Sequence, residues 1–266
     1  MKIGKEAHSA TAISGSDPET ILIRGHNLVG ELIGKITFTD HVWLLVAGAL
    51  PSEAQRRVLD ATLVAIAEHG LVPSVVASRM TLAAAPEALQ GAVAAGILGC
   101  GSVILGASEN AGKFFEEVRA EGGDLEAATR EVIGRYRAVK RAVPGYGHPL
   151  HKDFDPRARR LLEVGRETGT AGVYAEIALL IDRLLPEITG RPLKMNVSGA
   201  IPAVLLDAGY PLLALKGVPI LARTASLVGH LLEEQSRPVG FLMANAAAGA
   251  VRYDGPAPEG FVQSDN

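Results

Sequence analysis

The sequence contains a single cysteine, Cys100, so an internal disulfide is excluded. Because this thiol lies in an apolar stretch, we expect a buried, structural cysteine in a protein of the reducing cytoplasm. Runs of basic residues are also missing, and the formal net charge of -3 argues against a nucleic-acid partner. The first residues lack the apolar core of a secretion signal, which again favours a cytoplasmic protein.

Long alternating patterns of apolar and polar residues are missing too, so strands are expected only as a short hairpin within residues 11–31. Helical periodicity dominates elsewhere, and Ser52, Asp124 and Asp155 are suited to cap the first turns of three helices. The fold is therefore predicted to be nearly all-α. Helices are predicted at 52–70, 124–142, 155–169, 172–190 and 218–238.

Residues 89–107 carry no charge and are long enough to span a bilayer core about 30 Å thick. They are rich in glycine and alanine, and no aromatic or basic residue flanks them as an interfacial anchor. We therefore predict a buried, close-packed helix in this segment and no membrane partner.

Two glycine-containing breaks, near Gly106 and at 209–211, separate a middle helical segment from the rest of the chain. This pattern predicts a smaller helical domain inserted into a larger one. The predicted boundaries are 1–105 for the first part of the large domain, 106–209 for the small domain, and 210–266 for the second part of the large domain and the C-terminal tail.

Motifs for nucleotide, serine-hydrolase and metal chemistry are lacking. No Walker loop or nucleophile elbow occurs, and His148 and His151 have no cysteine or carboxylate at a metal-ligand spacing. His148 instead lies on a tight loop within "VPGYGHPLHKDFDPRARR", and Arg157 follows at the start of the next helix. An imidazole that hydrogen-bonds a keto oxygen, beside an arginine that binds a carboxylate, suits a 2-oxo acid. The alternative is a loop histidine that bonds only to the backbone.

Four further positions have both a functional and a structural interpretation. His69 precedes the glycine that ends a helix, where it can also interact with the helix dipole. Arg223 lies among apolar residues on a helix, where an arginine usually needs a buried partner. Arg237 precedes a proline at a helix end, where a solvated charge is the plainer interpretation. Ser198 lies at the start of a helix in "KMNVSGAIPAVLLDAGYP" and is suited to cap it.

Four blocks of the sequence resemble the citrate synthase and citryl-CoA lyase family. The resemblance extends from about Thr11 to Gly240, and the short chain looks most like stand-alone citryl-CoA lyases and the C-terminal domain of ATP-citrate lyase. It implies an all-α homodimer of large and small domains with the active site in the cleft between them. It also implies a coenzyme A thioester as substrate or product, and no bound cofactor or metal. The four blocks are "EHGLVPSVVASRMT", "PGYGHPLHKDFDPRA", "NVSGAIPAVLLDAGYP" and "ARTASLVGHLLEEQSRP".

The resemblance also assigns roles to single residues. His148 matches the histidine that hydrogen-bonds the ketone or hydroxyl oxygen and acts there as acid or base. Arg157 and Arg223 match two carboxylate-binding arginines, and Arg237 matches an arginine donated to the partner subunit across the interface. His69 matches a histidine that contacts the 2-oxo acid, and the main chain of Val143, Pro144, Gly145, Tyr146 and Gly147 matches the loop that receives the adenine of coenzyme A.

Two positions depart from the pattern of that family. Ile104 stands where citrate synthases have a histidine that hydrogen-bonds the thioester oxygen, although the ATP-citrate lyase domain also lacks this histidine. Ser198 stands where the family has an aspartate that moves the proton of the acyl-CoA methyl group. General acid–base catalysis contributes about 100- to 10,000-fold, which corresponds to about 3–5 kcal/mol of barrier. Efficient citrate synthesis is therefore not expected.

Cleavage is less affected by these changes, since it needs a base at the hydroxyl group and arginines for the carboxylates. The first hypothesis is a lyase that splits a 3-hydroxy-3-carboxyacyl-CoA, such as citryl-CoA, into an acyl-CoA and a 2-oxo acid such as oxaloacetate. The second is a decarboxylase or tautomerase of 2-oxo diacids that is independent of coenzyme A. The third is a non-catalytic homologue that binds di- or tricarboxylates.

Overall fold

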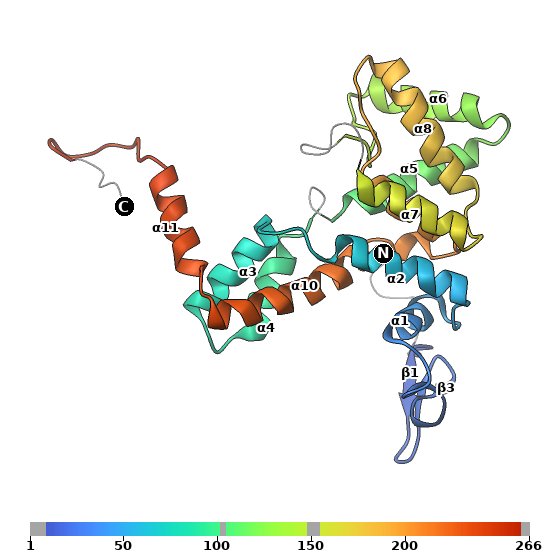
Figure 1. The fold of residues 1–266 in the computed structure, drawn as a ribbon, viewed down its shortest axis with the longest axis horizontal. Helices are drawn as coiled ribbons and strands as arrows, with labels where there is room; N and C mark the ends of the chain where they lie inside the picture. Colours follow the sequence, from blue (N-terminus) through green and yellow to red (C-terminus); the bar gives the residue numbers. More distant parts are fainter. Residues whose placement is uncertain (1–8, 102–104, 148–154, 262–266) are drawn as a thin grey trace. The chain divides into compact units, whose positions relative to one another are not determined.

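The computed structural model describes residues 9–101, 105–147 and 155–261. The chain is mostly helical and divides into two compact units (Figure 1). The first unit comprises Met1–Thr62 and Ser108–Leu215, and the second comprises Leu63–Ala107 and Lys216–Asn266. The nearly all-α fold is confirmed, whereas the domain boundaries inferred from the glycine breaks stay a prediction.

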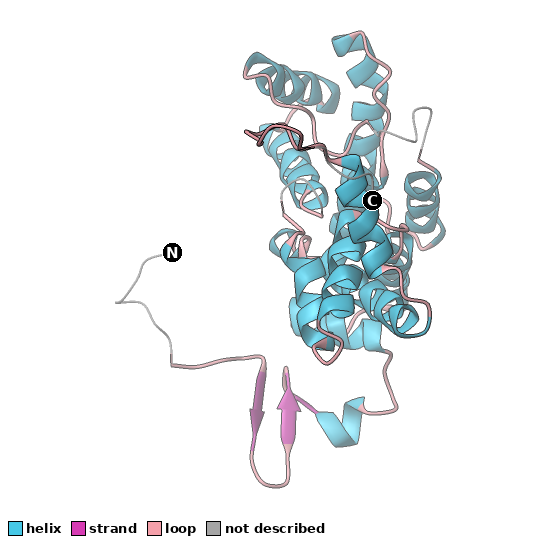
Figure 2. Cartoon of the chain, turned by 90° about the vertical axis from the view of Figure 1, so that its left-hand side faces the viewer, coloured by secondary structure: helices cyan, strands magenta, loops and turns pink. Residues whose placement is uncertain are grey.

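The N-terminal part of the first unit forms the expected hairpin, extended by a third short strand (Figure 2). The strands are antiparallel in the order β1-β2-β3, with Ser14 opposite Ile23. The Arg24 guanidinium donates hydrogen bonds to Leu45 O at 2.7 and 3.1 Å, which ties the sheet to the following helix. The elements are β1 (Ser14–Ser16), β2 (Ile21–Ile23), β3 (His26–Asn27), the short helix η1 (Leu28–Leu32) and α1 (Phe38–Ala47).

The core of the first unit is built around α9, which packs against α7 and α8. The helix α9 is an apolar run, and its residues from Gly199 to Leu205 are all buried. Phe114 and Phe115 on α5 are fully buried as well. The helices of this unit are α5 (Ala107–Glu121), α6 (Leu125–Ala138), α7 (Pro156–Glu167), α8 (Val173–Thr189), α9 (Val197–Asp207) and η2 (Leu212–Ala214), with α2 (Glu53–Ala67) ending in the second unit.

The second unit packs α3 against three other helices. Gly96 lies at a close approach between helices, because a Cβ atom there would be 2.7 Å from both Leu227 Cδ1 and Ser74 O. A larger residue at this position would push the helices apart. The helices of this unit are α3 (Pro73–Ala84), α4 (Leu89–Leu98), α10 (Gly217–Ser236) and α11 (Gly240–Ala250).

The capping residues expected from the sequence are confirmed. Ser52 Oγ accepts a hydrogen bond from Gln55 N at 3.2 Å, and Gln55 Oε1 accepts one from Ser52 N at 2.9 Å. Asp124 accepts from the third residue of α6 at 2.8 Å, and Asp155 caps α7. Local side-chain chemistry therefore determines where these helices begin.

The single buried helix predicted for 89–107 is wrong. The helix α4 ends at Leu98, whose side chain is 86% exposed, and the glycines that follow it do not favour continuation. With 10 residues, α4 is about 15 Å long and too short to span a bilayer. Cys100 is buried, as expected. Among the described residues, Leu212–Ser236 has the length and composition of a membrane span, a test that core helices of soluble proteins also pass.

Candidate functional site

The loop 143–147 of the first unit is bound to the start of α9 through its main chain. Asn196 N donates to Gly145 O at 3.0 Å, and Asn196 Nδ2 donates to Gly147 O at 2.6 Å. Gly147 N donates to Lys194 O at 2.7 Å. Gly145 has a φ of 86°, and a Cβ atom there would lie 2.6 Å from Gly199 Cα, so only glycine fits.

The side chains of this loop point into the protein. Val143 and Tyr146 are buried, and Tyr146 Oη donates a hydrogen bond to Ala178 O at 2.7 Å. Burial raises the pKa of Tyr146 well above its usual value, and the negative charge of Asp182 acts in the same direction. The phenol therefore stays protonated and anchors the loop.

Ser198 does not cap α9, contrary to the structural interpretation of the sequence. Asn196 is the N-cap, and its side chain accepts a hydrogen bond from Ser198 N at 2.9 Å. Ser198 is the second residue of the helix, and its side chain is partly exposed. Among the described residues, none is hydrogen-bonded to its hydroxyl group. The Ser198 hydroxyl therefore remains available at the positive end of the helix dipole.

Asp155 joins the starts of α7 and α9 and holds Arg157. Its side chain is 1% exposed and accepts hydrogen bonds from Arg157 N, Nε and Nη2 at 3.0, 3.0 and 2.8 Å. It also accepts one from Val197 N at 2.9 Å. Burial favours a higher pKa for Asp155, but the hydrogen bonds from Arg157 and Val197 outweigh it and lower the pKa below 3.8. Asp155 is therefore a carboxylate that fixes Arg157 near Ser198, a role that the sequence did not reveal beyond the cap.

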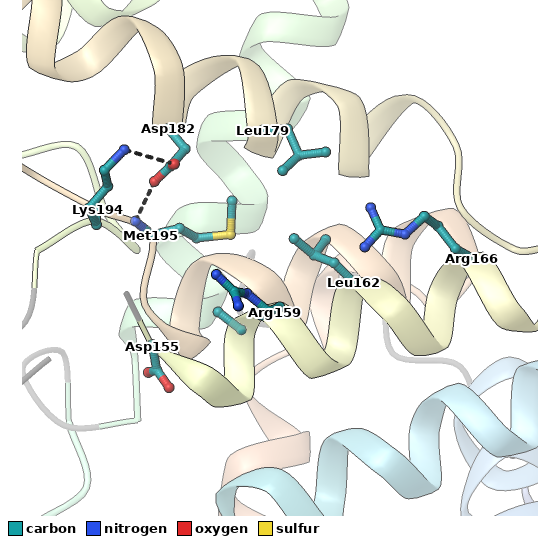
Figure 3. Close-up of a pocket in the computed structure, with 9 residues that line it drawn as sticks. Asp155, Arg159, Leu162, Arg166, Leu179, Asp182, Lys194 and Met195 are labelled. Atoms are coloured by element: carbon teal, nitrogen blue, oxygen red, sulfur yellow. Dashed lines mark hydrogen bonds and ion pairs between the residues drawn. The ribbon is translucent and has the colours of Figure 1, made fainter. Parts of the chain in front are cut away.

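A cavity of about 380 Å³ opens beside this arrangement in the first unit (Figure 3). Arg159 and Arg166 line it from α7, and Asp182 on α8 accepts a hydrogen bond from Met195 N at 2.7 Å. Lys194 Nζ lies 3.4 Å from Asp182 Oδ2, and the Lys194 carbonyl binds the loop described above. Three cationic side chains line this cavity against the two carboxylates of Asp155 and Asp182, and this excess of positive charge suits an anionic group such as a phosphate. Its lining is completed by Asp155, Ala158, Leu162 and Leu179.

The second unit holds the most unusual polar group, Arg223 on α10. Its side chain is buried, yet Nε and Nη1 have no hydrogen-bond partner among the residues that the structure describes. Among the described residues, only the buried hydroxyl of Ser74 shares this property. Burial raises the pKa of the Cys100 thiol, and the positive charge of Arg223 opposes that increase. Buried polar groups are nearly always paired, so an unpaired buried guanidinium points to a missing anion.

The other two predicted substrate contacts also belong to the second unit. His69 is exposed and follows Glu68, a carboxylate that contacts Gly70 N and the side chains of Ser226 and His230. Arg237 is the C-terminal cap residue of α10. Its side chain is 81% exposed, and Nη1 lies 3.7 Å from Glu233 Oε1.

The structure thus brings together part of the predicted site in each unit. The first unit gathers the loop 143–147, Arg157 and Ser198, and the second carries His69, Arg223 and Arg237. His148 and Ile104 lie outside the described residues. Within the described ranges, no group of three or more histidine, cysteine, aspartate or glutamate side chains could hold a metal ion.

Comparisons with known proteins identify the family and the fold. The family described as citrate synthase, C-terminal domain, matches residues 51–239. The structure of citryl-CoA lyase from Hydrogenobacter thermophilus is similar, with 31% identity, a TM-score of 0.84 and 98% of both chains covered. The ATP citrate lyase of Methanothrix soehngenii, solved with citrate and coenzyme A, has 22% identity and a TM-score of 0.77 over 98% of this chain and 44% of its own.

Among curated proteins, a citrate synthase-like protein of Aspergillus oryzae is 27% identical over 209 residues. This match covers 76% of the present chain and 45% of the fungal one. The chain spans about half the length, or less, of the first curated relatives that it matches.

Proposed function

The chain belongs to the citrate synthase family, and we propose that it is a carbon–carbon lyase of the citryl-CoA lyase type. It splits a 3-hydroxy-3-carboxyacyl-CoA, such as citryl-CoA, into an acyl-CoA and a 2-oxo acid such as oxaloacetate. The observation that carries this proposal is the buried, unpartnered Arg223 guanidinium. The whole-chain likeness to a citryl-CoA lyase of the same length supports the direction of the reaction.

Substrate carboxylates are the anions that satisfy the arginines. A buried polar group without a partner costs about 1–3 kcal/mol, and more when it is charged. A carboxylate bound at Arg223 would pair the buried guanidinium and remove this cost, so the same contact would both bind the ligand and stabilise the protein. Arg157 contributes a second guanidinium, with Nε and Nη2 held by Asp155 and Nη1 left for the ligand. The family resemblance assigns both arginines to carboxylate binding, so we propose a di- or tricarboxylate as the substrate.

Coenzyme A is assigned to the first unit. The main chain of the loop 143–147 receives the adenine, since its Val143 and Tyr146 side chains are buried. The adjoining cavity lined by Arg159, Arg166 and Lys194 then offers positive charge for the phosphates. The Methanothrix soehngenii relative, which was solved with coenzyme A and citrate, supports this choice of ligands.

Cleavage follows from these assignments. His148 takes the proton of the substrate hydroxyl group, and the oxygen re-forms a carbonyl. The bond between this carbon and the methylene carbon beside the thioester breaks, and its electron pair passes to the thioester as an enolate. A proton from water, relayed by the Ser198 hydroxyl, completes the acyl-CoA. Asp155 does not supply this proton, because its lowered pKa keeps it ionised near neutral pH.

A homodimer completes the site by lending Arg237 to the partner subunit. Two apolar helix surfaces flank this residue in the chain, and their large side chains are exposed. On α10, Val228 and Leu232 are 51% and 68% exposed, and on α11, Phe241 and Leu242 are 65% and 67% exposed. Exposed apolar surface of this kind marks an interface. A second copy that covers these helices would meet Arg237 between them.

The test is to incubate the purified protein with citryl-CoA and couple released oxaloacetate to malate dehydrogenase. We expect the wild type to release oxaloacetate and Arg223→Met to release none. Arg135→Lys is the control, because Arg135 belongs to a surface ion pair with Glu121 and should not affect release. No rate above background from folded, dimeric protein would refute the lyase. Oxaloacetate consumption without coenzyme A would support the decarboxylase or tautomerase instead. Thermal stabilisation by di- or tricarboxylates without any turnover would support a binding homologue, which the loss of the family aspartate at Ser198 favours.

A further inference from the structure

A buried ionic cluster in the second unit surrounds Arg79 on α3, whose side chain is almost fully buried. Arg79 Nε donates to Glu234 Oε2 at 2.6 Å, and Nη1 donates to Glu233 Oε2 at 2.9 Å. Nη2 donates to the main-chain oxygen of Arg237 at 3.1 Å. All three nitrogens of one guanidinium are thus directed at the C-terminal end of α10. The hydrogen bonds to these carboxylates raise the pKa of Arg79 against the opposing effect of burial, so its charge is permanent.

The same cluster holds the turn that follows Arg237. Glu234 Oε1 accepts hydrogen bonds from Val239 N at 2.9 Å and Gly240 N at 2.7 Å. A Cβ atom at Gly240 would lie 2.5 Å from Ala83 Cβ and 2.9 Å from Arg79 O, so the turn is pressed against α3. Arg237 N also donates a hydrogen bond to Glu233 O at 2.7 Å, so the main chain is held on both sides of the Arg237 side chain.

We propose that Arg79 is a positioning residue for Arg237. This inference rests on the proposed function, in which Arg237 binds a carboxylate in the partner subunit's site. The Arg237 side chain is 81% exposed, and within the described part of the chain its one ion pair is the 3.7 Å contact with Glu233, so its own contacts do not fix its direction. Its direction is set by its main chain, and Arg79 and Glu234 hold that main chain.

The same cluster also contacts the segment that carries His69, through His230 and Glu68. Arg79 Nη1 lies 3.5 Å from His230 Nδ1, and His230 Nε2 lies 2.9 Å from Glu68 Oε2. A neutral ring with its hydrogen on Nε2 satisfies both contacts, since Arg79 then donates to Nδ1 and Nε2 donates to Glu68. Glu68 Oε1 in turn accepts a hydrogen bond from Gly70 N at 2.5 Å. One guanidinium therefore connects the chain segments on which His69 and Arg237 lie.

A purely structural ion pair would predict something different. Arg79→Lys keeps the positive charge, but an ammonium group cannot reproduce the three directed hydrogen bonds of the planar guanidinium group. If Arg79 only stabilised the core, this change would act like any destabilising core substitution in the unit. Leu82→Ala is the matched control, because Leu82 is buried on the same helix in a purely apolar cluster with Ala92 and Leu231.

The experiment uses the full chain and two independent readouts. The first is amide hydrogen exchange in peptides covering 237–243, which needs no turnover. We expect Arg79→Lys and Glu234→Gln to raise the amide exchange rate of this turn about tenfold more than Leu82→Ala does. The comparison is made after each rate is corrected for the variant's global free energy of unfolding. Unchanged protection of these amides from exchange in both variants would overturn the positioning role. If Arg79→Lys does not fold, Glu234→Gln alone decides the outcome.

The second readout is a double-mutant cycle with Arg237→Ala, measured as kcat/KM for citryl-CoA. A displacement of about 1 Å can cost about 100-fold, so we expect Arg79→Lys to lower kcat/KM by about 10- to 100-fold, mainly through KM. The Arg79→Lys/Arg237→Ala double variant should then have the same kcat/KM as Arg237→Ala alone. In the Leu82→Ala/Arg237→Ala double variant, the fold-losses of the two single variants should multiply. Full multiplication for Arg79→Lys would overturn the inference. If the wild type does not cleave citryl-CoA, the lyase proposal fails while hydrogen exchange still decides the role of Arg79.

Discussion

Ser198→Asp introduces the carboxylate that the family resemblance leads us to expect at this position, and the structure indicates that the helix tolerates it. Ser198 is partly exposed at the second position of α9, and Asn196 caps the helix without its help. A negative charge in a first turn contributes about 0.3–1 kcal/mol through the helix dipole. We therefore expect stability to change by less than about 1 kcal/mol.

The catalytic effect should be much larger than the effect on stability. A positioned general base contributes about 100- to 10,000-fold, or about 3–5 kcal/mol of barrier. The Asp155 carboxylate is bound to the adjacent Val197 N and is paired with Arg157, so the introduced carboxylate would lie beside an ion pair whose charges offset each other.

The assay is deuterium incorporation into the methyl group of acetyl-CoA in heavy water, followed by mass spectrometry. Ser198→Asn is the control, since it has nearly the same shape without the charge. We expect exchange in Ser198→Asp to exceed both the wild type and the control by about 100-fold or more. Equal exchange in both variants, with folded protein, would refute the placement of the thioester methyl group beside Ser198.

Four further substitutions test single features of the two units. Arg223→Met should stabilise the unliganded protein by about 1–3 kcal/mol in urea denaturation, because it removes an unpaired buried charge, yet abolish thermal stabilisation by dicarboxylates. Asp155→Asn should cost about 1.5–3 kcal/mol at pH 7. Because the pKa of Asp155 is lowered from 3.8 in the folded state, this difference should persist above that pH and vanish as the pH falls through the lowered value. Gly145→Ala should destabilise the first unit by at least about 1–3 kcal/mol, since its φ is positive and Gly199 lies against it. Leu232→Glu should convert a dimer to monomers in analytical ultracentrifugation, and an unchanged sedimentation coefficient would place the interface elsewhere.

The fold could be predicted from the sequence because its signals are local. Ser52, Asp124 and Asp155 sit where their side chains reach backbone N–H groups within three residues, and the structure shows these contacts. The error at 89–107 has a physical cause as well. An uncharged run of glycine and alanine carries no periodicity, so the sequence does not show that the helix ends at Leu98.

The candidate site was only partly predictable, since its contacts join residues that are distant in sequence. Arg223 could be recognised as a guanidinium among apolar residues, but its lack of a partner is a property of packing. The role of Asp155 depends on Val197, 42 residues further along the chain. Arg79 was not singled out in the sequence, and its contact with the main chain of Arg237 spans 158 residues. The N-cap of α9 was assigned to Ser198 because both serine and asparagine suit that position.

The most direct measurement of the central claim is product analysis of citryl-CoA cleavage by the folded protein. The account predicts acetyl-CoA and oxaloacetate in equal amounts, formed by the wild type and absent in Arg223→Met. Intact citryl-CoA after prolonged incubation with folded, dimeric wild-type protein would contradict it.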